Sequence, residues 1–136
     1  MQTTPIIAIH LTAAVAATML GPIALWARRS GAAHPRLHRA AGYAWVTFML
    51  VTALSAVFIQ GDKGPRFAGF GLIHLLIPVT LAMLLLSFRH LLRGNITGHR
   101  KTMQRLYLGA CVVAGAFTLL PDRLLGHYLW SSLGLV

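Results

Sequence analysis

Long apolar runs alternate with short polar stretches along this chain. A run of about 20 apolar residues spans a bilayer core, and within lipid its backbone must pair its own polar groups as a helix. The apolar runs are Pro5–Ala27, Ala40–Ile59, Phe67–Phe88 and Leu106–Leu120. Together with the turns that lead into them, they predict transmembrane helices over residues 5–27, 38–59, 67–91 and 99–120, and an interfacial tail over 121–136.

Composition supports a membrane protein with one integral domain over residues 1–136. Of the 136 residues, 57% are hydrophobic and 10% are charged, whereas about 25% of a typical soluble protein is charged. A pI near 11.7 would suggest nucleic acid as a partner in a soluble chain. Here the basic residues fall in loops between apolar runs, so their distribution reports membrane topology instead.

The basic residues divide unequally between the two sides of the predicted helices. Only three lie on the side of the termini: Lys63, Arg66 and Arg123. Nine lie around the other two loops: Arg28, Arg29, Arg36, Arg39, Arg89, Arg93, Arg100, Lys101 and Arg105. The positive-inside rule therefore predicts a multi-pass protein of the cytoplasmic membrane with both termini outside.

The two halves of the chain share one plan. Each has a histidine in an apolar segment, then arginines, and then a His-Arg pair that opens the next run. This plan predicts two similar helical hairpins, which short loops would join into an up-down-up-down four-helix bundle. In such a bundle the first and third helices are diagonal, as are the second and fourth.

That geometry pairs four histidines at two depths. We expect His10 and His74, each about two turns into its helix, to lie near the outer face, and His38 and His99 near the inner face. Two opposed imidazoles suit the fifth and sixth positions of a haem iron, whereas zinc takes three or four ligands around one point. No Cys-x-x-Cys-His motif occurs, so one or two non-covalent b-type haems are expected.

Arginines adjoin the inner pair. Arg39 and Arg100 follow His38 and His99 directly, and a guanidinium pairs a carboxylate in bidentate fashion. They could hold haem propionates or an anionic donor. The alternative is that these His-Arg pairs bind lipid phosphate at the headgroup level.

Three functional hypotheses remain open. The first is a b-type cytochrome that passes electrons across or within the membrane, with quinone or a redox protein as partner. The second is a cofactor-free accessory or assembly subunit of a larger complex, or a homo-oligomer, whose histidines bond between helices. The third is a carrier of a metal or small molecule. No hydrolase or transferase motif is present, so any enzymatic role would be as an oxidoreductase component.

Small residues and prolines refine these hypotheses. Ala13, Ala17 and Gly21 share the helical face of His10; they either make room for a porphyrin or permit close helix packing. A proline cannot bond the carbonyl four residues earlier, so Pro22 should free the carbonyl of Thr18. Pro78 should likewise free that of His74 and kink its helix.

The aromatic residues near the helix ends are typical of an interfacial belt. They are Trp26, Tyr43, Trp45, Tyr107 and Trp130. Tyr43 and Trp45 could instead line a quinone pocket.

Three segments carry a resemblance to a known family. They are "HPRLHRAAGYAWV" (34–46), "GHRKTMQRLYLGA" (98–110) and "AGAFTLLPDRLLG" (114–126). In these the chain resembles a bacterial family of small predicted membrane proteins grouped as a domain of unknown function, which implies a helical fold in the inner membrane with paired His-Arg motifs.

A looser similarity is to four-helix b-type cytochromes of the cytochrome b561 and ferric-reductase kind. Those proteins hold two haems, each between histidines of alternate helices, which implies ligation by His10 with His74 and by His38 with His99. This chain departs from that pattern because His38 and His99 open their helices.

Overall fold

The computed structural model describes residues 4–28, 34–59, 66–67 and 70–135, and it is predominantly helical. The predicted all-α class is confirmed. The helices are α1 (Pro5–Trp26), α2 (Pro35–Ala56), α3 (Leu76–Leu92), α4 (Ile96–Leu106), α5 (Ala114–Thr118) and α6 (Leu124–Ser132). A 3-10 turn, η1 (Leu72–Leu75), precedes α3, and a π-helical segment, η2 (Tyr107–Val113), joins α4 to α5.

The first helix matches its prediction closely. Thr4 is extended and Pro5 occupies the first helical position, where a missing N–H costs nothing. Of the described residues, α1 alone is both long and apolar enough to cross a membrane. Threonine hydroxyls in α1 and α2 donate to carbonyls four residues earlier. Each of these hydroxyls thus has its hydrogen-bond acceptor within its own helix.

The second helix begins slightly earlier than predicted. It starts at Pro35 rather than at residue 38, because proline again suits the first turn. The fourth begins at Ile96, where Asn95 caps it by accepting from the Gly98 N–H at 2.8 Å. His38 and His99 are therefore each the fourth residue of their helices, which strengthens the similarity of the two hairpins.

The predicted third helix is wrong in its first part. The described residues ahead of Leu76 form no α-helix: β1 (Arg66–Phe67) pairs antiparallel with β2 (Phe70–Gly71), and η1 follows. The glycines of this stretch disfavour a helix. Pro78 is the third residue of α3, within the first turn, whose N–H groups have no helical partner. Pro78 therefore helps to start α3 and does not kink its interior. His74 lies in the 3-10 turn rather than two turns inside a helix.

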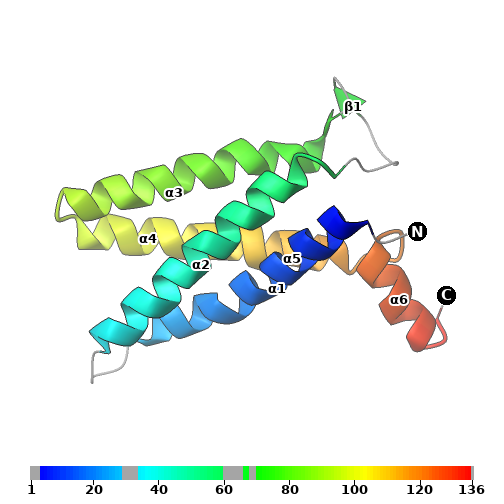
Figure 1. Ribbon diagram of the computed structural model, residues 1–136, viewed down its shortest axis with the longest axis horizontal. Coiled ribbons are helices and arrows are strands. Elements are labelled where there is room, and N and C mark those ends of the chain that lie inside the picture. The colour runs from blue at the N-terminus through cyan, green and yellow to red at the C-terminus, as the bar shows by residue number, and fades with distance from the viewer. Residues whose placement is uncertain (1–3, 29–33, 60–65, 68–69, 136) are drawn as a thin grey trace.

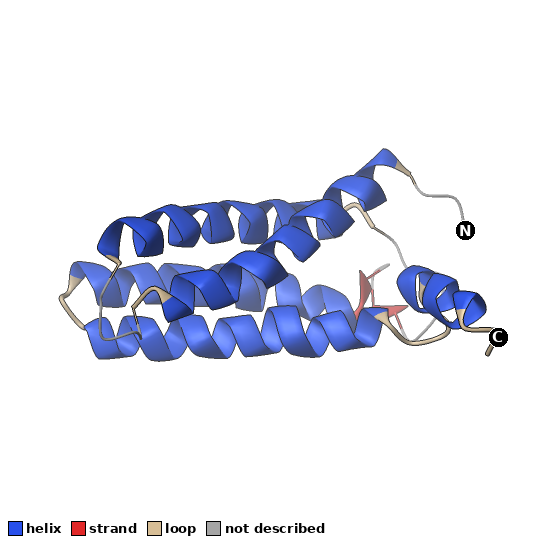
Figure 2. Ribbon diagram, turned by 90° about the horizontal axis from the view of Figure 1, so that it is seen from below, coloured by secondary structure: helices blue, strands red, loops and turns tan. Residues whose placement is uncertain are grey.

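The two hairpins pack obliquely against each other. Figure 1 shows the α1–α2 hairpin crossing the α3–α4 hairpin, with the end of α1, the start of α2 and the turn between α3 and α4 gathered at one end, the hairpin-loop end. The two termini and α6 lie at the opposite end in both views (Figures 1 and 2). The core between them is a cluster of Ala17, Trp45, Met49, Leu84, Leu106 and Cys111.

The C-terminal tail is a docked helix. The indole N–H of Trp130 donates to the Leu119 carbonyl at 2.8 Å, and the backbone of Gly126 lies directly against the Leu120 carbonyl. These contacts hold α6 against the end of α5. Trp130 thus has an anchoring contact in addition to its predicted place in an aromatic belt.

Candidate functional site

The predicted His10 ligand bonds to the neighbouring helix. Its Nδ1 lies 2.9 Å from the Thr52 carbonyl and 3.1 Å from Ser55 Oγ, both in α2. A carbonyl only accepts, so Nδ1 carries the proton and donates. Ser55 is buried, which makes this an interior bond between α1 and α2.

His38 makes the reciprocal bond from α2 to α1. Its Nδ1 lies 2.8 Å from the Ala24 carbonyl, so this nitrogen also carries the proton. The hairpin is therefore joined by a histidine near each end. Each ring is held by a hydrogen bond to its neighbour in the hairpin rather than to a diagonal helix.

His99 makes the equivalent bond in the second hairpin. Its Nδ1 lies 2.8 Å from Ser87 Oγ and 3.2 Å from the Ser87 carbonyl, and Ser87 Oγ is 3.5 Å from the His99 carbonyl. A proton on Nδ1 satisfies all three contacts, because the hydroxyl can then donate to the His99 carbonyl. Ser87 is fully buried, and sequence analysis assigned it no role.

His74 differs from the other three. Its Nε2 lies 2.9 Å from the Ile59 carbonyl, so Nε2 must be the protonated nitrogen. Its Nδ1 accepts from the Gly71 N–H at 3.2 Å. Both ring nitrogens are used, which fixes the 3-10 turn against the end of the first hairpin.

These tautomers decide which histidines suit a metal. A ligating histidine usually donates its other ring N–H to a carbonyl or similar acceptor. His10, His38 and His99 do so through Nδ1, which leaves the Nε2 lone pair for a ligand. His38 and His99 thus have the protonation of a metal-ligating imidazole, whereas His74 would have to release a backbone bond to serve as a ligand of the outer pair.

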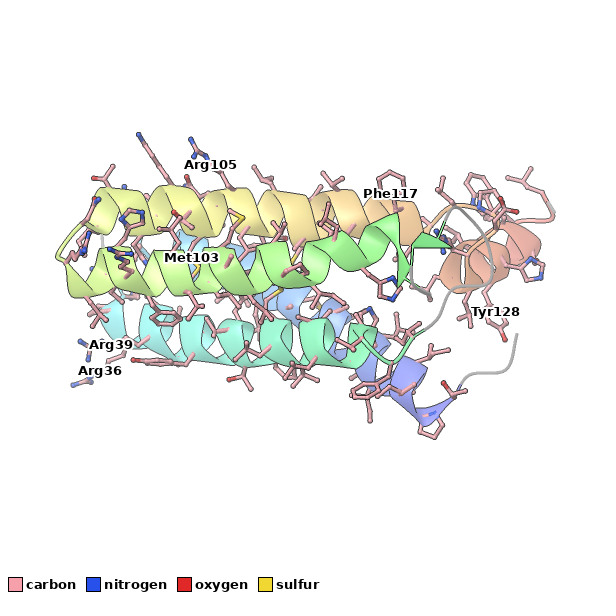
Figure 3. The ribbon with its side chains drawn as sticks, turned by 90° about the horizontal axis from the view of Figure 1, so that it is seen from above. Arg36, Arg39, Met103, Arg105, Phe117 and Tyr128 are labelled. Atoms are coloured by element: carbon pink, nitrogen blue, oxygen red, sulfur yellow. The ribbon has the colours of Figure 1, made fainter. Side chains whose placement is uncertain are left out.

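The arginines beside the inner pair are exposed at the hairpin-loop end. Arg39 and Arg100 are both exposed. In Figure 3 the side chains of Arg36 and Arg39 point away from the bundle at this end. Their charge is therefore presented to the surroundings rather than to the space between the helices.

The small-residue face of α1 is filled by protein. A Cβ on Gly21 would clash with the ring of Tyr107 and would lie 3.2 Å from Trp45 Nε1. Ala13 and Ala17 are buried along the same face. Gly21 therefore permits close helix packing, and the space beside it is filled by protein side chains rather than left for a porphyrin.

Tyr107 has a role that sequence analysis missed. Pro22 was predicted to free the carbonyl of Thr18, and this carbonyl accepts from the Tyr107 hydroxyl at 3.0 Å. Tyr107 is the first residue of η2, so the bond joins the two hairpins. The freed carbonyl was the available signal; its partner lies 89 residues away in the sequence.

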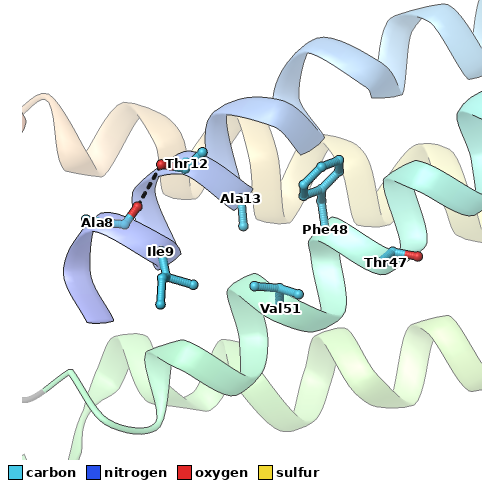
Figure 4. Close-up of a pocket in the computed structure, with 7 residues that line it drawn as sticks. All are labelled: Ala8, Ile9, Thr12, Ala13, Thr47, Phe48 and Val51. Atoms are coloured by element: carbon cyan, nitrogen blue, oxygen red, sulfur yellow. Dashed lines mark hydrogen bonds between the residues drawn. The ribbon is translucent and has the colours of Figure 1, made fainter. Parts of the chain in front are cut away.

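An apolar groove lies apart from the histidines. It has a volume of about 380 Å³ and is lined by Ala8, Ile9, Thr12, Ala13, Thr47, Phe48 and Val51. Figure 4 shows these side chains between α1 and α2, with the Thr12 hydroxyl bound to the Ala8 carbonyl at 2.8 Å. None of these lining residues is charged, so the groove fits a hydrocarbon chain better than a polar substrate.

Two of the remaining histidines, His34 and His90, have local partners. His34 stacks on Trp26 with ring centroids 5.7 Å apart, and His90 Nδ1 lies 3.3 Å from Asn95 Nδ2. In the part of the chain that the structure describes, no three His, Cys, Asp or Glu side chains gather into a metal-binding group. The carrier hypothesis thus has no metal cluster in the described residues to support it.

Comparison with known proteins identifies the family. No curated protein and no solved structure matches the chain, so neither comparison supports the similarity to cytochrome b561. A family model described as predicted membrane protein (DUF2306) matches residues 7–130. That match covers most of the chain and agrees with its apolar composition and helical fold. The chain belongs to the DUF2306 family of predicted membrane proteins.

Proposed function

We propose that this chain crosses the cytoplasmic membrane four times and is a b-type cytochrome. The spans would be α1, α2, η1 with α3, and α4 continuing through η2 and α5. The apolar outer surface supports this, since large side chains such as Met19, Leu85 and Phe58 are 68%, 73% and 72% exposed. The loops with most of the positive charge would face the cytoplasm.

The observation that carries the haem proposal is the matched bonding of His38 and His99. Each is the fourth residue of its helix, and each can donate from Nδ1 to the preceding helix. That bond orients the ring and keeps the Nε2 lone pair for a ligand. We therefore assign His38 and His99 as the first pair of haem-iron ligands.

The outer pair is a weaker assignment on the same criterion. His10 holds its Nε2 lone pair, but both nitrogens of His74 bond backbone groups. An outer haem would require the 3-10 turn to release His74. The proposal thus requires one haem, at the inner pair, and a second haem at the outer pair would be an extension of it.

The haem and the side chains of this protein would have separate roles. A bound haem supplies one-electron chemistry at a potential set by its ligands and surroundings. The chain's own residues hold the imidazoles at fixed depth, shield the interior with Trp45 and Met49, and present cations at the inner face. A quinone or a redox protein would serve as partner, because the chain carries no nucleotide-binding motif.

Haem titration of purified haem-free protein tests the assignment. We expect one equivalent of haem to bind with a sharp Soret band. His38→Ala and His99→Ala should each abolish the bis-histidine spectrum, while His127→Ala, at an exposed position in α6, should not. Equal binding by all of these variants would refute the inner site.

A specific observation favours one other function, a cofactor-free accessory subunit. All four candidate histidines already bond neighbouring chain segments, as interhelical glue requires. On this hypothesis His38→Gln and His99→Gln retain assembly, since glutamine also donates and accepts. The cytochrome hypothesis predicts that the same variants fold but lose haem.

A further inference from the structure

We propose that the exposed face of α4 docks a transmembrane helix of another protein, and that this partner helix carries a carboxylate. The residues of this face, the α4 cationic face, are Thr97, Lys101 and Arg105. They follow one another at intervals of four, so they are neighbours on the helix surface. The proposal rests on the four membrane spans proposed above and does not depend on haem.

The exposed face of α4 is polar, unlike that of α1. The residues of α4 that face the bundle, Thr102 and Leu106, are buried, whereas Lys101 and Arg105 are exposed. In Figure 3 the Arg105 side chain points away from the bundle. The exposed face of α1 instead carries large apolar side chains such as Met19. Lipid chains can therefore cover α1, but a charged face is costly to expose to them.

A contact within the second hairpin gives the depth of Arg105. Ser87 of α3 bonds His99 of α4 at 2.8 Å, and the two helices run antiparallel (Figure 1). Six residues further along α4, Arg105 is therefore level with about residue 81 of α3, because both helices rise about 1.5 Å per residue. The span formed by η1 and α3 covers residues 72–92. Arg105 thus lies beside the middle of that span.

A contact between the hairpins agrees with this depth. The Tyr107 hydroxyl reaches the Thr18 carbonyl, and Thr18 precedes the end of α1 at Trp26 by about 12 Å along the helix axis. Arg105 itself follows the start of α4 at Ile96 by about 14 Å. Since a bilayer core is about 30 Å thick, Arg105 would lie close to the midplane rather than among the headgroups.

Neither this chain nor a second copy can supply an acid to Arg105 at that depth. The sequence contains two acidic residues, Asp62 and Asp122, and both lie outside the apolar runs. Asp122, the acidic residue that the structure describes, follows α5. Charged side chains within a membrane are rare and almost always pair with one another or face the interior of a bundle. A carboxylate that pairs with Arg105 must therefore come from a different protein.

The surface one turn beyond Arg105 allows a helix to approach closely. Gly109 lies there, and a Cβ added to it would meet nothing within 4 Å. Small residues let transmembrane helices pack closely. Leu108 and Val112, nearby in η2, are 56% and 47% exposed and would pack against apolar side chains of the partner. The partner helix would thus contact η2 while its carboxylate binds the Arg105 guanidinium in bidentate fashion.

Binding of a designed transmembrane peptide to the full-length protein tests the proposal. The peptide is a helix of leucine and alanine with one glutamate at its centre, and a matched peptide has glutamine there. Fluorescence energy transfer to the labelled protein in phosphatidylcholine vesicles measures the affinity of each. We expect the glutamate peptide to bind about tenfold more tightly, or about 1.4 kcal/mol, within the range of polar contacts between membrane helices. Equal binding of the two peptides would overturn the proposal.

Variants of α4 and its neighbourhood locate the site. Arg105→Gln should abolish the preference for glutamate, whereas Arg105→Lys keeps the charge and should retain most of the preference. Arg36→Gln removes the same charge at the hairpin-loop end and should leave the preference unchanged. Gly109→Leu should weaken the binding of both peptides, because it fills the surface on which they pack. A preference that survives Arg105→Gln, or that Arg36→Gln removes, would place the carboxylate elsewhere.

Two further measurements separate the proposal from its alternatives. Phosphatidylglycerol added to the vesicles should leave the preference intact; if it abolished the preference, Arg105 would bind lipid phosphate instead. In a Cys111→Ala background, Leu108→Cys should resist a water-soluble maleimide that reaches both sides of the vesicles, whereas Asn95→Cys should react. Reaction at Leu108→Cys would refute the fourth span and this proposal with it, whereas equal peptide binding alone would refute the docking site and leave the spans intact.

Discussion

At the scale of single residues, a proline and a tyrosine on different hairpins form one bonding unit. Pro22 cannot donate to Thr18, and the hydroxyl of Tyr107 donates instead at 3.0 Å. An unsatisfied carbonyl is costly in an apolar medium. The tyrosine therefore compensates for a defect in α1 and joins the hairpins at the same time.

Replacing Tyr107 by Phe should reveal this compensation. We expect a loss of about 0.5–1.5 kcal/mol in the free energy of unfolding in detergent, the usual net contribution of a hydrogen bond. Pro22→Ala restores an N–H for Thr18, so Tyr107→Phe should cost less in that background. Tyr128→Phe, at a tyrosine that is 61% exposed, serves as the control. If Tyr107→Phe cost the same in the parent and in the Pro22→Ala background, the two residues would not be coupled.

Gly21 provides a second test at this scale, because it sits under the Tyr107 ring. Gly21→Ala forces the ring to move, and such overpacking costs about 1–3 kcal/mol. Gly42→Ala is matched to it: a Cβ there meets nothing within 4 Å. The control should be neutral or stabilising by up to about 1 kcal/mol, since alanine favours helix. Thermal unfolding of both variants in one detergent makes the comparison, and equal changes would contradict the close packing.

Residue-level prediction from sequence succeeded where the cause was local. The free carbonyl of Thr18 followed from the chemistry of proline alone. The identity of its partner required the fold, because Tyr107 reaches it from a different hairpin. Ser87 carried no signal in the sequence, since a serine in an apolar run only gains a role when His99 is placed beside it.

At the scale of elements, each hairpin is held by side chains that bond from one segment to its neighbour. His10 and His38 join α1 to α2, and His99 joins α4 to α3. His74 fixes the 3-10 turn to the end of the first hairpin. The helix pairs therefore have polar anchors in addition to their apolar packing.

Ser87→Ala tests the anchor of the second hairpin. It removes the 2.8 Å contact with His99 Nδ1 and leaves the ring held by a carbonyl alone. We expect stability to fall by about 1 kcal/mol and hydrogen exchange to increase at the start of α4. Ser132→Ala, at an exposed serine of α6 that bonds its own helix, should change neither. Unchanged exchange in Ser87→Ala would show that the hairpin does not depend on this bond.

The apolar runs coincide with α1, α2 and α3, whereas α4 lies ahead of the apolar run Leu106–Leu120, and not all boundaries were predicted. The predicted start of the third helix at residue 67 was wrong: Phe67 lies in β1, the glycine at 71 disfavours a helix, and Pro78 belongs to the first turn of α3. The π-helical segment over Tyr107–Val113 was also unpredicted. Its apolar side chains would suit an α-helix equally well, so nothing in the local sequence indicated the change in pitch.

At the scale of the whole molecule, positive charge is concentrated at one end of the bundle. Most of the described arginines and Lys101 lie at the hairpin-loop end, whereas α6 and both termini lie at the other end. The positive-inside rule turns this asymmetry into a proposed orientation in the membrane. The apolar exterior between the two ends is then the surface that contacts lipid.

Single-cysteine labelling tests that orientation. In a Cys111→Ala background, Ser132→Cys should react with a membrane-impermeant maleimide on intact spheroplasts, because the proposed orientation places α6 outside. Asn95→Cys, in the loop between α3 and α4, should react only after permeabilisation. The reverse pattern would invert the topology, and it would place the hairpin-loop end outside.

The most direct test of the central claim is a reduced-minus-oxidised absorption spectrum. The protein would be purified in mild detergent from cells supplied with haem precursor, alongside His38→Ala, His99→Ala and His127→Ala. The proposal predicts a sharp α band and a Soret band in the parent and in His127→Ala, both lost in the two inner-pair variants. A parent protein that folds, remains colourless and stays colourless after haem is added would contradict the cytochrome and favour the accessory subunit.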